Sequence, residues 1–121
     1  MRRSHLHFLD DIGEACGNIL SYTKGMSYRE FASDRRTQDA VIRNFEIIGE
    51  AVKNLPDDFK SRHPSVAWKQ VAGLRDILAH GYFRVDYEIV WGIITERIPV
   101  FKKDIAKILR EEERREKDTH Q

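Results

Sequence analysis

The feature that most constrains the fold is a long apolar stripe between Asp34 and Pro56. Within this segment, apolar residues recur every three or four positions, at Val41, Phe45, Ile48, Val52 and Leu55. This spacing places them on one face of an α-helix. Asp34 can cap the start of that helix, and Pro56 ends it because proline has no backbone N–H to donate. A long helix with one apolar face needs other helices to cover that face.

The rest of the chain shows the same helical period. Further helices are predicted over residues 4–22, 68–79, 86–98 and 100–110. The first of these has its apolar face at Leu9, Ile12, Cys16 and Ile19. A short helical connector is expected over residues 27–31, where Ser27 and Glu30 have the spacing of a capping box. Residues 56–64 are expected to form a turn, and the helix that Asp86 caps is expected to stop before Pro99.

The predicted fold is therefore all-α, an antiparallel bundle of four to five helices. No segment alternates apolar and polar residues as a half-buried strand does. The bundle is predicted to occupy residues 1–110 as one domain. Residues 111–121 carry mixed charges without apolar anchors, so they are interpreted as a solvated helix end that frays into a tail.

Charge and hydropathy limit the functional classes to which the chain can belong. The 121 residues include 21 Lys and Arg against 20 Asp and Glu, a formal net charge of +1. Because the whole chain has no positive field, a nucleic-acid site would have to be a local patch. The longest apolar stretch, residues 89–94, is far shorter than the ~20 residues that span a bilayer. No signal peptide is expected, and the one cysteine cannot form an internal disulfide, so a cytoplasmic location is predicted.

The segment 73–83 contains the residues best suited to chemistry. Asp76 and His80 are four residues apart and would share a helix face. On an unbroken helix, Arg75 and His80 would point ~140° apart. They can converge on one ligand only if the helix ends near His80 or a second subunit supplies one of them, and Gly81 can provide that end. With the Tyr82 hydroxyl, the guanidinium and imidazole could bind an anion and move a proton without a metal.

A purely structural interpretation of the same residues stays open. Arg75 can pair with a carboxylate, His80 can donate to the last carbonyl groups of the helix, and Tyr82 can be a half-buried aromatic residue. Glu50 lies within an apolar segment, where it is expected to pair with an arginine such as Arg75 or Arg43. It would then support the site rather than react.

A second candidate surface is basic. Arg35, Arg36 and Arg43 recur along one predicted helix, and the last two are seven residues apart on one face. Arg84 follows the segment just described. Together they could bind an RNA backbone, although interspersed acidic residues also allow an ordinary solvated surface.

Metal and cofactor sites are not predicted. The histidines at positions 5, 7, 63 and 120 lack the spacing of metal ligands, and the chain has no glycine-rich phosphate loop. Cys16, Trp68 and Trp91 are expected to be packing residues rather than a nucleophile or base-stacking platforms.

The segment 73–83 also resembles a motif of a known protein family. Arg75, His80 and Tyr82 match the R-x4-H-x-Y motif of the HEPN superfamily, and the chain resembles the HepT-like toxins. The segments FASDRRTQD (31–39) and AVIRNFEIIGEA (40–51) resemble the second long helix of that family. The resemblance covers about residues 5–105. Gly81 departs from the family pattern, in which a polar or acidic residue is common at that position.

The resemblance implies an all-α homodimer with the motif at a cleft between the subunits. It implies a metal-independent endoribonuclease in which Arg75 and His80 are catalytic, supported by Asp76, Tyr82 and Glu50. It also implies a partner, a nucleotidyltransferase antitoxin of the MntA type that attaches AMP to Tyr82 and silences the toxin. The alternatives are a non-enzymatic helical module that binds a nucleotide or a partner, and a purely structural dimer partner.

Overall fold

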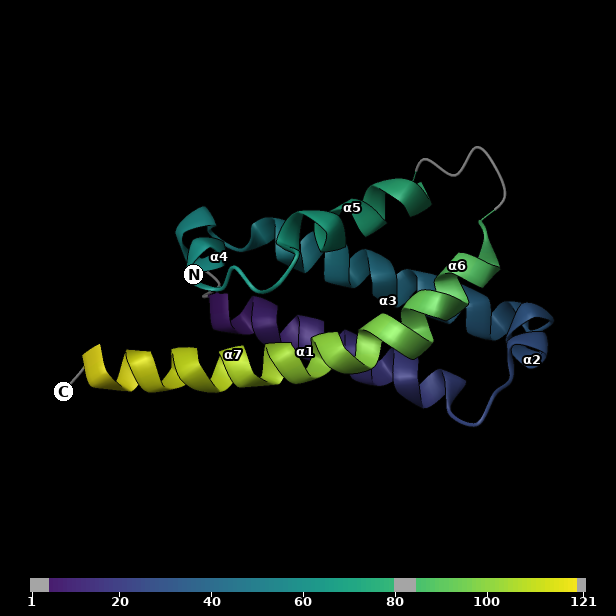
Figure 1. Cartoon of the computed structure of the whole chain (residues 1–121), viewed down its shortest axis with the longest axis horizontal. Helices are drawn as coiled ribbons and strands as arrows, with labels where there is room; N and C mark the ends of the chain where they lie inside the picture. The colour runs from purple at the N-terminus through teal and green to yellow at the C-terminus, as the bar shows by residue number, and fades with distance from the viewer. Residues whose placement is uncertain (1–4, 80–84, 120–121) are drawn as a thin grey trace.

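The computed structural model describes residues 5–79 and 85–119, with the side chains of residues 5–74 and 85–118. This part of the chain is helical and contains no strand. Its elements, in chain order, are α1 (His5–Thr23), α2 (Tyr28–Ala32), α3 (Arg35–Asn54), α4 (Asp57–Arg62), α5 (Trp68–Ala79), α6 (Tyr87–Gly92), the π-helical segment η1 (Ile93–Arg97) and α7 (Ile98–Thr119) (Figure 1). The predicted all-α class is confirmed.

Four long helices form the body of the bundle. The second of them, α3, packs against α1 and α5, and α7 packs against α1. Consecutive long helices run in opposite directions, as Figure 1 shows, so the predicted antiparallel arrangement is confirmed. The short helices α2 and α4 lie at opposite ends of this bundle, where they connect α1 to α3 and α3 to α5. None of the described helices combines the length and hydrophobicity needed to cross a bilayer.

The core consists of the predicted apolar faces. On α1 and α3, the stripe residues are all buried: Leu9, Ile12, Cys16, Ile19, Val41, Phe45, Ile48 and Val52. Ile105 and Ile108 of α7, which packs against α1, are buried in the same core. Burying one such side chain stabilises the fold by about 1.5–3 kcal/mol. The period of the sequence therefore identified the packing faces correctly.

The predicted caps are present. The Ser27 side chain accepts a hydrogen bond from the Glu30 N–H at 3.1 Å, and the Glu30 carboxylate accepts one from the Ser27 N–H at 3.1 Å. Asp34 and Asp86 each accept a hydrogen bond from a backbone N–H in the first turn of α3 and α6. Gly25, with φ of +77°, occupies the turn after α1. Its missing Cβ allows this left-handed conformation. The starts of α2, α3 and α6 are thus set by local hydrogen bonds.

The turn predicted over residues 56–64 contains a helix instead. Residues 57–62 form α4, which begins directly after Pro56. Its first turn carries Asp57 and Asp58, and its last turn ends at Arg62, so the charges suit the helix dipole. The buried ring of Phe59 anchors it to the core. The segment was too short for periodicity to reveal the helix.

The predicted helix end before Pro99 is wrong. The chain continues from α6 through η1 into α7, and the Ile98 N–H donates to the Ile93 carbonyl oxygen, five residues earlier. In a regular α-helix, the proline ring would clash with the carbonyl group four residues before it. The wider π turn relieves this conflict, which is how such turns are commonly used inside helices.

The mixed-charge end of the chain is helical and mostly exposed. Helix α7 runs to Thr119, and the residues of 111–118 are exposed with one exception, Glu112, of which only 4% is accessible. The burial of Glu112 shows that the prediction of a solvated segment over residues 111–121 is wrong at this position. The domain boundary at residue 110 stays a prediction.

Candidate active site

Helix α5 carries the first half of the motif. Arg75 and Asp76 lie in its C-terminal half, and α5 is described from Trp68 to Ala79, whereas its predicted end near Gly81 lies outside the described residues. Their side chains are outside the described part, as are His80, Tyr82 and Arg84 altogether. The convergence of the motif side chains therefore stays a prediction, and the structure shows the framework that carries them.

The start of α5 is fixed by Trp68. The indole Nε1 donates a hydrogen bond to the His63 carbonyl oxygen at 2.9 Å, and the ring lies 6.0 Å from that of Phe59. Only 7% of Trp68 is exposed, so its predicted role as a packing residue is confirmed. Val71 and Ala72, one turn further on, also pack against the core. The N-terminal half of α5 is thus a well-anchored support for Arg75.

Helix α6 is the next described element after α5. Asp86 caps α6, so residues 80–84 connect the ends of two helices. Helix α6 is held to α2 by aromatic contacts: the ring of Phe31 lies 5.2 Å from that of Trp91 and 6.1 Å from that of Tyr87. Trp91 is half-buried and packs against the core, as predicted. The described part of the motif thus lies on α5, and the next described helix, α6, packs against α2.

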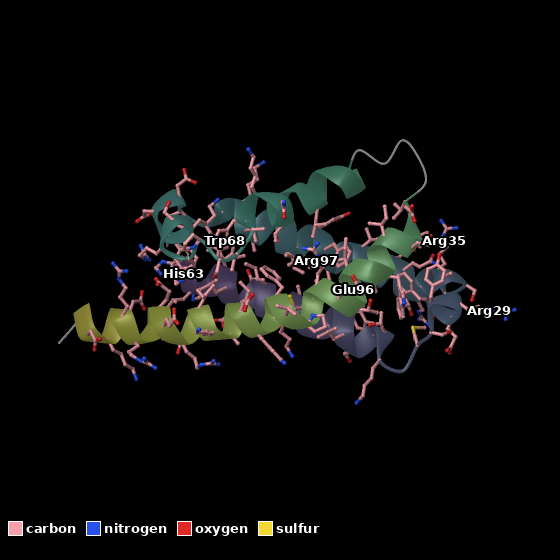
Figure 2. All side chains as sticks on the ribbon, in the orientation of Figure 1. Arg29, Arg35, His63, Trp68, Glu96 and Arg97 are labelled. Carbon is pink, nitrogen blue, oxygen red and sulfur yellow. The ribbon has the colours of Figure 1, made fainter. Side chains whose placement is uncertain are left out.

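Arginines gather at the same end of the bundle. Because α3 and α5 are antiparallel neighbours, Arg36 in the first turn of α3 lies toward the end of the molecule where α5 ends. Arg35 beside it and Arg29 of α2 are also exposed at this end (Figure 2). Arg29 was not part of the predicted basic patch, because it lies in a short connector outside the periodic helix.

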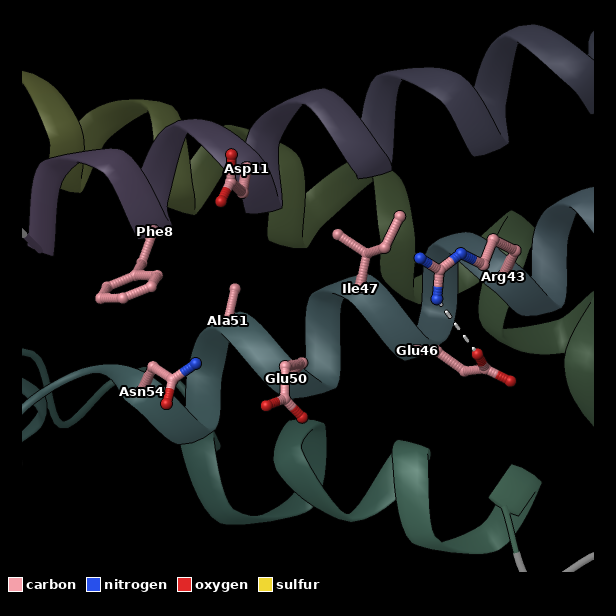
Figure 3. Close-up of a pocket in the computed structure, with 8 residues that line it drawn as sticks. All are labelled: Phe8, Asp11, Arg43, Glu46, Ile47, Glu50, Ala51 and Asn54. Carbon is pink, nitrogen blue, oxygen red and sulfur yellow. Dashed lines mark hydrogen bonds and ion pairs between the residues drawn. The ribbon is translucent and has the colours of Figure 1, made fainter. Parts of the chain in front are cut away.

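Arg43 and Glu50 line a separate pocket of about 370 Å³ between α1 and α3 (Figure 3). The Arg43 guanidinium pairs with Glu46, with 3.5 Å between Nη1 and Oε2. Asp11 and Glu50 line the same pocket, so carboxylates outnumber the one guanidinium and the surroundings of Arg43 are negative. This weakens its attraction for a phosphate chain. The exposed Glu50 side chain points from α3 toward α5.

The Cys16 thiol has a structural role in the core. Burial raises the pKa of the Cys16 thiol to about 12, so the expectation of a packing thiol is confirmed. No set of three or more His, Cys, Asp and Glu side chains within the described residues has an arrangement that could hold a metal ion.

Comparison with known proteins identifies the family. The family described as "Ribonuclease HepT-like" matches residues 12–108. The chain is 45% identical over 108 residues to the "Probable ribonuclease HepT" of Thermococcus cleftensis. The aligned region covers 89% of this chain and 98% of that protein. The chain is 48% identical over 104 residues to "Putative RNase MJ0127" of Methanocaldococcus jannaschii, which covers 86% of each chain. No solved structure matches the chain significantly.

The family match extends from the first long helix to the last and includes the whole segment between α5 and α6. It is supported by high identity to relatives of nearly the same length. The chain therefore belongs to the HepT-like family of the HEPN superfamily.

Proposed function

We propose that this chain is a metal-independent endoribonuclease and the toxin of a toxin–antitoxin pair. The observation that carries the proposal is the family match over residues 12–108, which spans the intact Arg75-x4-His80-x-Tyr82 motif. Relatives of nearly the same length bear the names of ribonucleases.

The proposed chemistry needs two copies of the chain. One His80 cannot easily act as both base and acid on opposite sides of a phosphate, but a symmetric dimer supplies two. One imidazole takes the proton from a ribose 2′-hydroxyl, whose oxygen attacks the phosphorus. The other protonates the departing 5′-oxygen, leaving a 2′,3′-cyclic phosphate. Arg75 stabilises the negative charge that develops on the phosphorane.

Two carboxylates support these groups in the proposal. Asp76 is four residues from His80 and can orient a protonated imidazole. Glu50 projects from α3 toward α5 and is proposed to hold Arg75 in place. Neither carboxylate would touch the RNA.

The RNA backbone is proposed to cross the end of the bundle where α5 ends. Arg36 and Arg84 would contact phosphates there, with Arg29 and Arg35 extending the positive surface. Arg43 would contribute less, because its guanidinium already pairs with Glu46.

Cleavage of RNA by the purified chain tests the enzymatic proposal. Incubated with single-stranded RNA and excess EDTA, the protein should produce fragments with 2′,3′-cyclic phosphate ends, detected by mass spectrometry. Cleavage that disappears with EDTA would contradict the metal-free mechanism. No cleavage with or without divalent ions would favour the alternative, a module that binds a nucleotide or a partner without catalysis.

The proposed partner is an MntA-type nucleotidyltransferase that attaches AMP to Tyr82. The added phosphates would place negative charge and bulk at the site and repel RNA. After coexpression with an MntA-type transferase, the intact mass should increase by one or more AMP units. Tyr82→Phe should abolish the increase, whereas Tyr22→Phe should keep it, since Tyr22 is an exposed tyrosine in α1, outside the motif. An undiminished increase in the Tyr82 variant would exclude that residue as the acceptor.

A further inference from the structure

The C-terminal part of α7 contains a buried carboxylate, that of Glu112. Its partners are one arginine and two histidines, which come from α1, from α4 and from the residue after α4. Oε1 of Glu112 lies 2.7 Å from Nη2 of Arg62 and 3.3 Å from Nε2 of His5. Its Oε2 lies 3.1 Å from Nε2 of His63. A carboxylate that is 96% buried is costly unless it is paired in this way. Glu112 therefore ties α7 to α4, to α1 and to His63.

These contacts continue to the first residue of α5. The His63 backbone carbonyl accepts the hydrogen bond from Nε1 of Trp68 at 2.9 Å. The ring of Phe59 lies 5.0 Å from that of His63 and 6.0 Å from that of Trp68, and the Arg62 guanidinium lies 5.5 Å from the centre of the same ring. The side chain of Glu112 thus reaches the start of α5 through one residue, His63. Figure 2 shows His63 and Trp68 close together at this end of the bundle.

Beyond Trp68, the main support of α5 among the described elements is α3. Helix α5 packs on α3, whereas its side toward η1 and α7 borders a cavity of about 280 Å³. Val71 and Leu74 line this cavity from α5, and Ile93 and Phe101 line it from the opposite side. Because a cavity borders this side of α5, the orientation of the helix depends on its packing against α3 and on the contacts of Trp68 with His63 and Phe59.

A small movement at Trp68 would be transmitted to the motif. Arg75 is seven residues further along the same helix, about 10 Å at 1.5 Å per residue. Helices move as nearly rigid units, so a rotation at the first residue displaces the later ones. Misplacement of a catalytic group by about 1 Å can lower a rate about 100-fold.

We propose that Glu112 is a positioning residue, whose ion pairs with Arg62 and His63 hold the start of α5 and so place Arg75 and Asp76. The consequence for catalysis rests on the proposed ribonuclease function. The consequence for the position of Trp68 does not, so the two can be tested separately.

The first test compares Glu112→Gln with Glu111→Gln. The control residue is next to Glu112 on the same helix, but 45% of its side chain is exposed and its nearest contact, to Nδ1 of His63, is 4.0 Å long. At a temperature well below the melting point of every variant, Glu112→Gln should lower kcat for RNA cleavage about 10- to 100-fold, with KM within about twofold of the original. Glu111→Gln should leave both constants unchanged.

The second readout needs no RNA. In a Trp91→Phe background, Trp68 is the one remaining tryptophan, so the fluorescence of the protein reports the surroundings of its indole directly. Glu112→Gln should shift its emission to longer wavelength and increase quenching by acrylamide, because the indole gains contact with water. Glu111→Gln should change neither.

A pair of His63 variants covers the case in which Glu112→Gln does not fold. His63→Gln keeps a side-chain N–H near the position of Nε2 and should retain both kcat and the Trp68 emission. His63→Ala removes that donor and should reproduce the losses of Glu112→Gln. Unchanged Trp68 emission in His63→Ala and Glu112→Gln would overturn the proposal. Altered emission with unchanged kcat would overturn its catalytic part, and an inactive original chain would contradict the ribonuclease function but not the anchoring of α5.

Discussion

Replacement of His80 by alanine is expected to lower the rate constant of RNA cleavage by about 10²- to 10⁴-fold, the usual contribution of a positioned general acid or base. Arg75→Ala should lower it by about 10²- to 10³-fold, because a charge that stabilises the phosphorane is lost. Both variants should keep the secondary structure and the oligomeric state of the original chain. Single-turnover cleavage of a defined RNA, with EDTA present, measures the effect.

Two exposed residues of the same types provide matched controls. His7 lies on the solvent side of α1, and Arg110 is exposed on α7. Alanine at either position should leave the cleavage rate within about twofold of that of the original chain, because surface substitutions away from a site rarely affect function. Full activity in His80→Ala or Arg75→Ala would remove that residue from the mechanism. Equal losses in a variant and its control would point to a general effect of charge rather than catalysis.

The parts of the fold that sequence reasoning predicted are those with local causes. The stripe from Val41 to Leu55 repeats within one helix, and the capping box of Ser27 and Glu30 spans four residues. Both patterns are complete within a few turns, so the sequence alone displays them. The two errors have local causes too: α4 is shorter than two full turns, and the π turn before Pro99 has no distinct sequence signature.

The features that could not be predicted depend on residues far apart in the chain. Glu112 lies in a run of charged residues, and its partners are about 50 positions away in sequence for Arg62 and His63, and further for His5. Nothing in the run distinguishes this glutamate from its exposed neighbours. The motif of α5 is different again: its spacing allowed both a structural and a catalytic interpretation, and the family resemblance favoured the second.

The buried carboxylate of Glu112 should also give the fold a dependence on pH. Burial alone would raise the pKa of Glu112, but the hydrogen bonds and charges of Arg62 and His63 outweigh it and hold the pKa below its ordinary value. A lowered pKa in the folded state means that ionised Glu112 stabilises the fold above the ordinary carboxylate pKa of about 4.3. That contribution is lost as the pH falls through the lowered value.

At pH 7, Glu112→Gln should therefore lower the free energy of unfolding by about 3 kcal/mol, since it removes the charge of a buried carboxylate that pairs with Arg62 and contacts His63. Urea unfolding measured from pH 7 to pH 3 should show the original chain losing this advantage below about pH 4, as Glu112 itself becomes protonated. Glu111→Gln should cost less than about 1 kcal/mol at pH 7, as expected for an exposed pair. A difference between the original chain and Glu112→Gln that stayed constant down to pH 3 would show that the charge of Glu112 does not stabilise the fold. In that case, the cluster would act through packing around Phe59 alone.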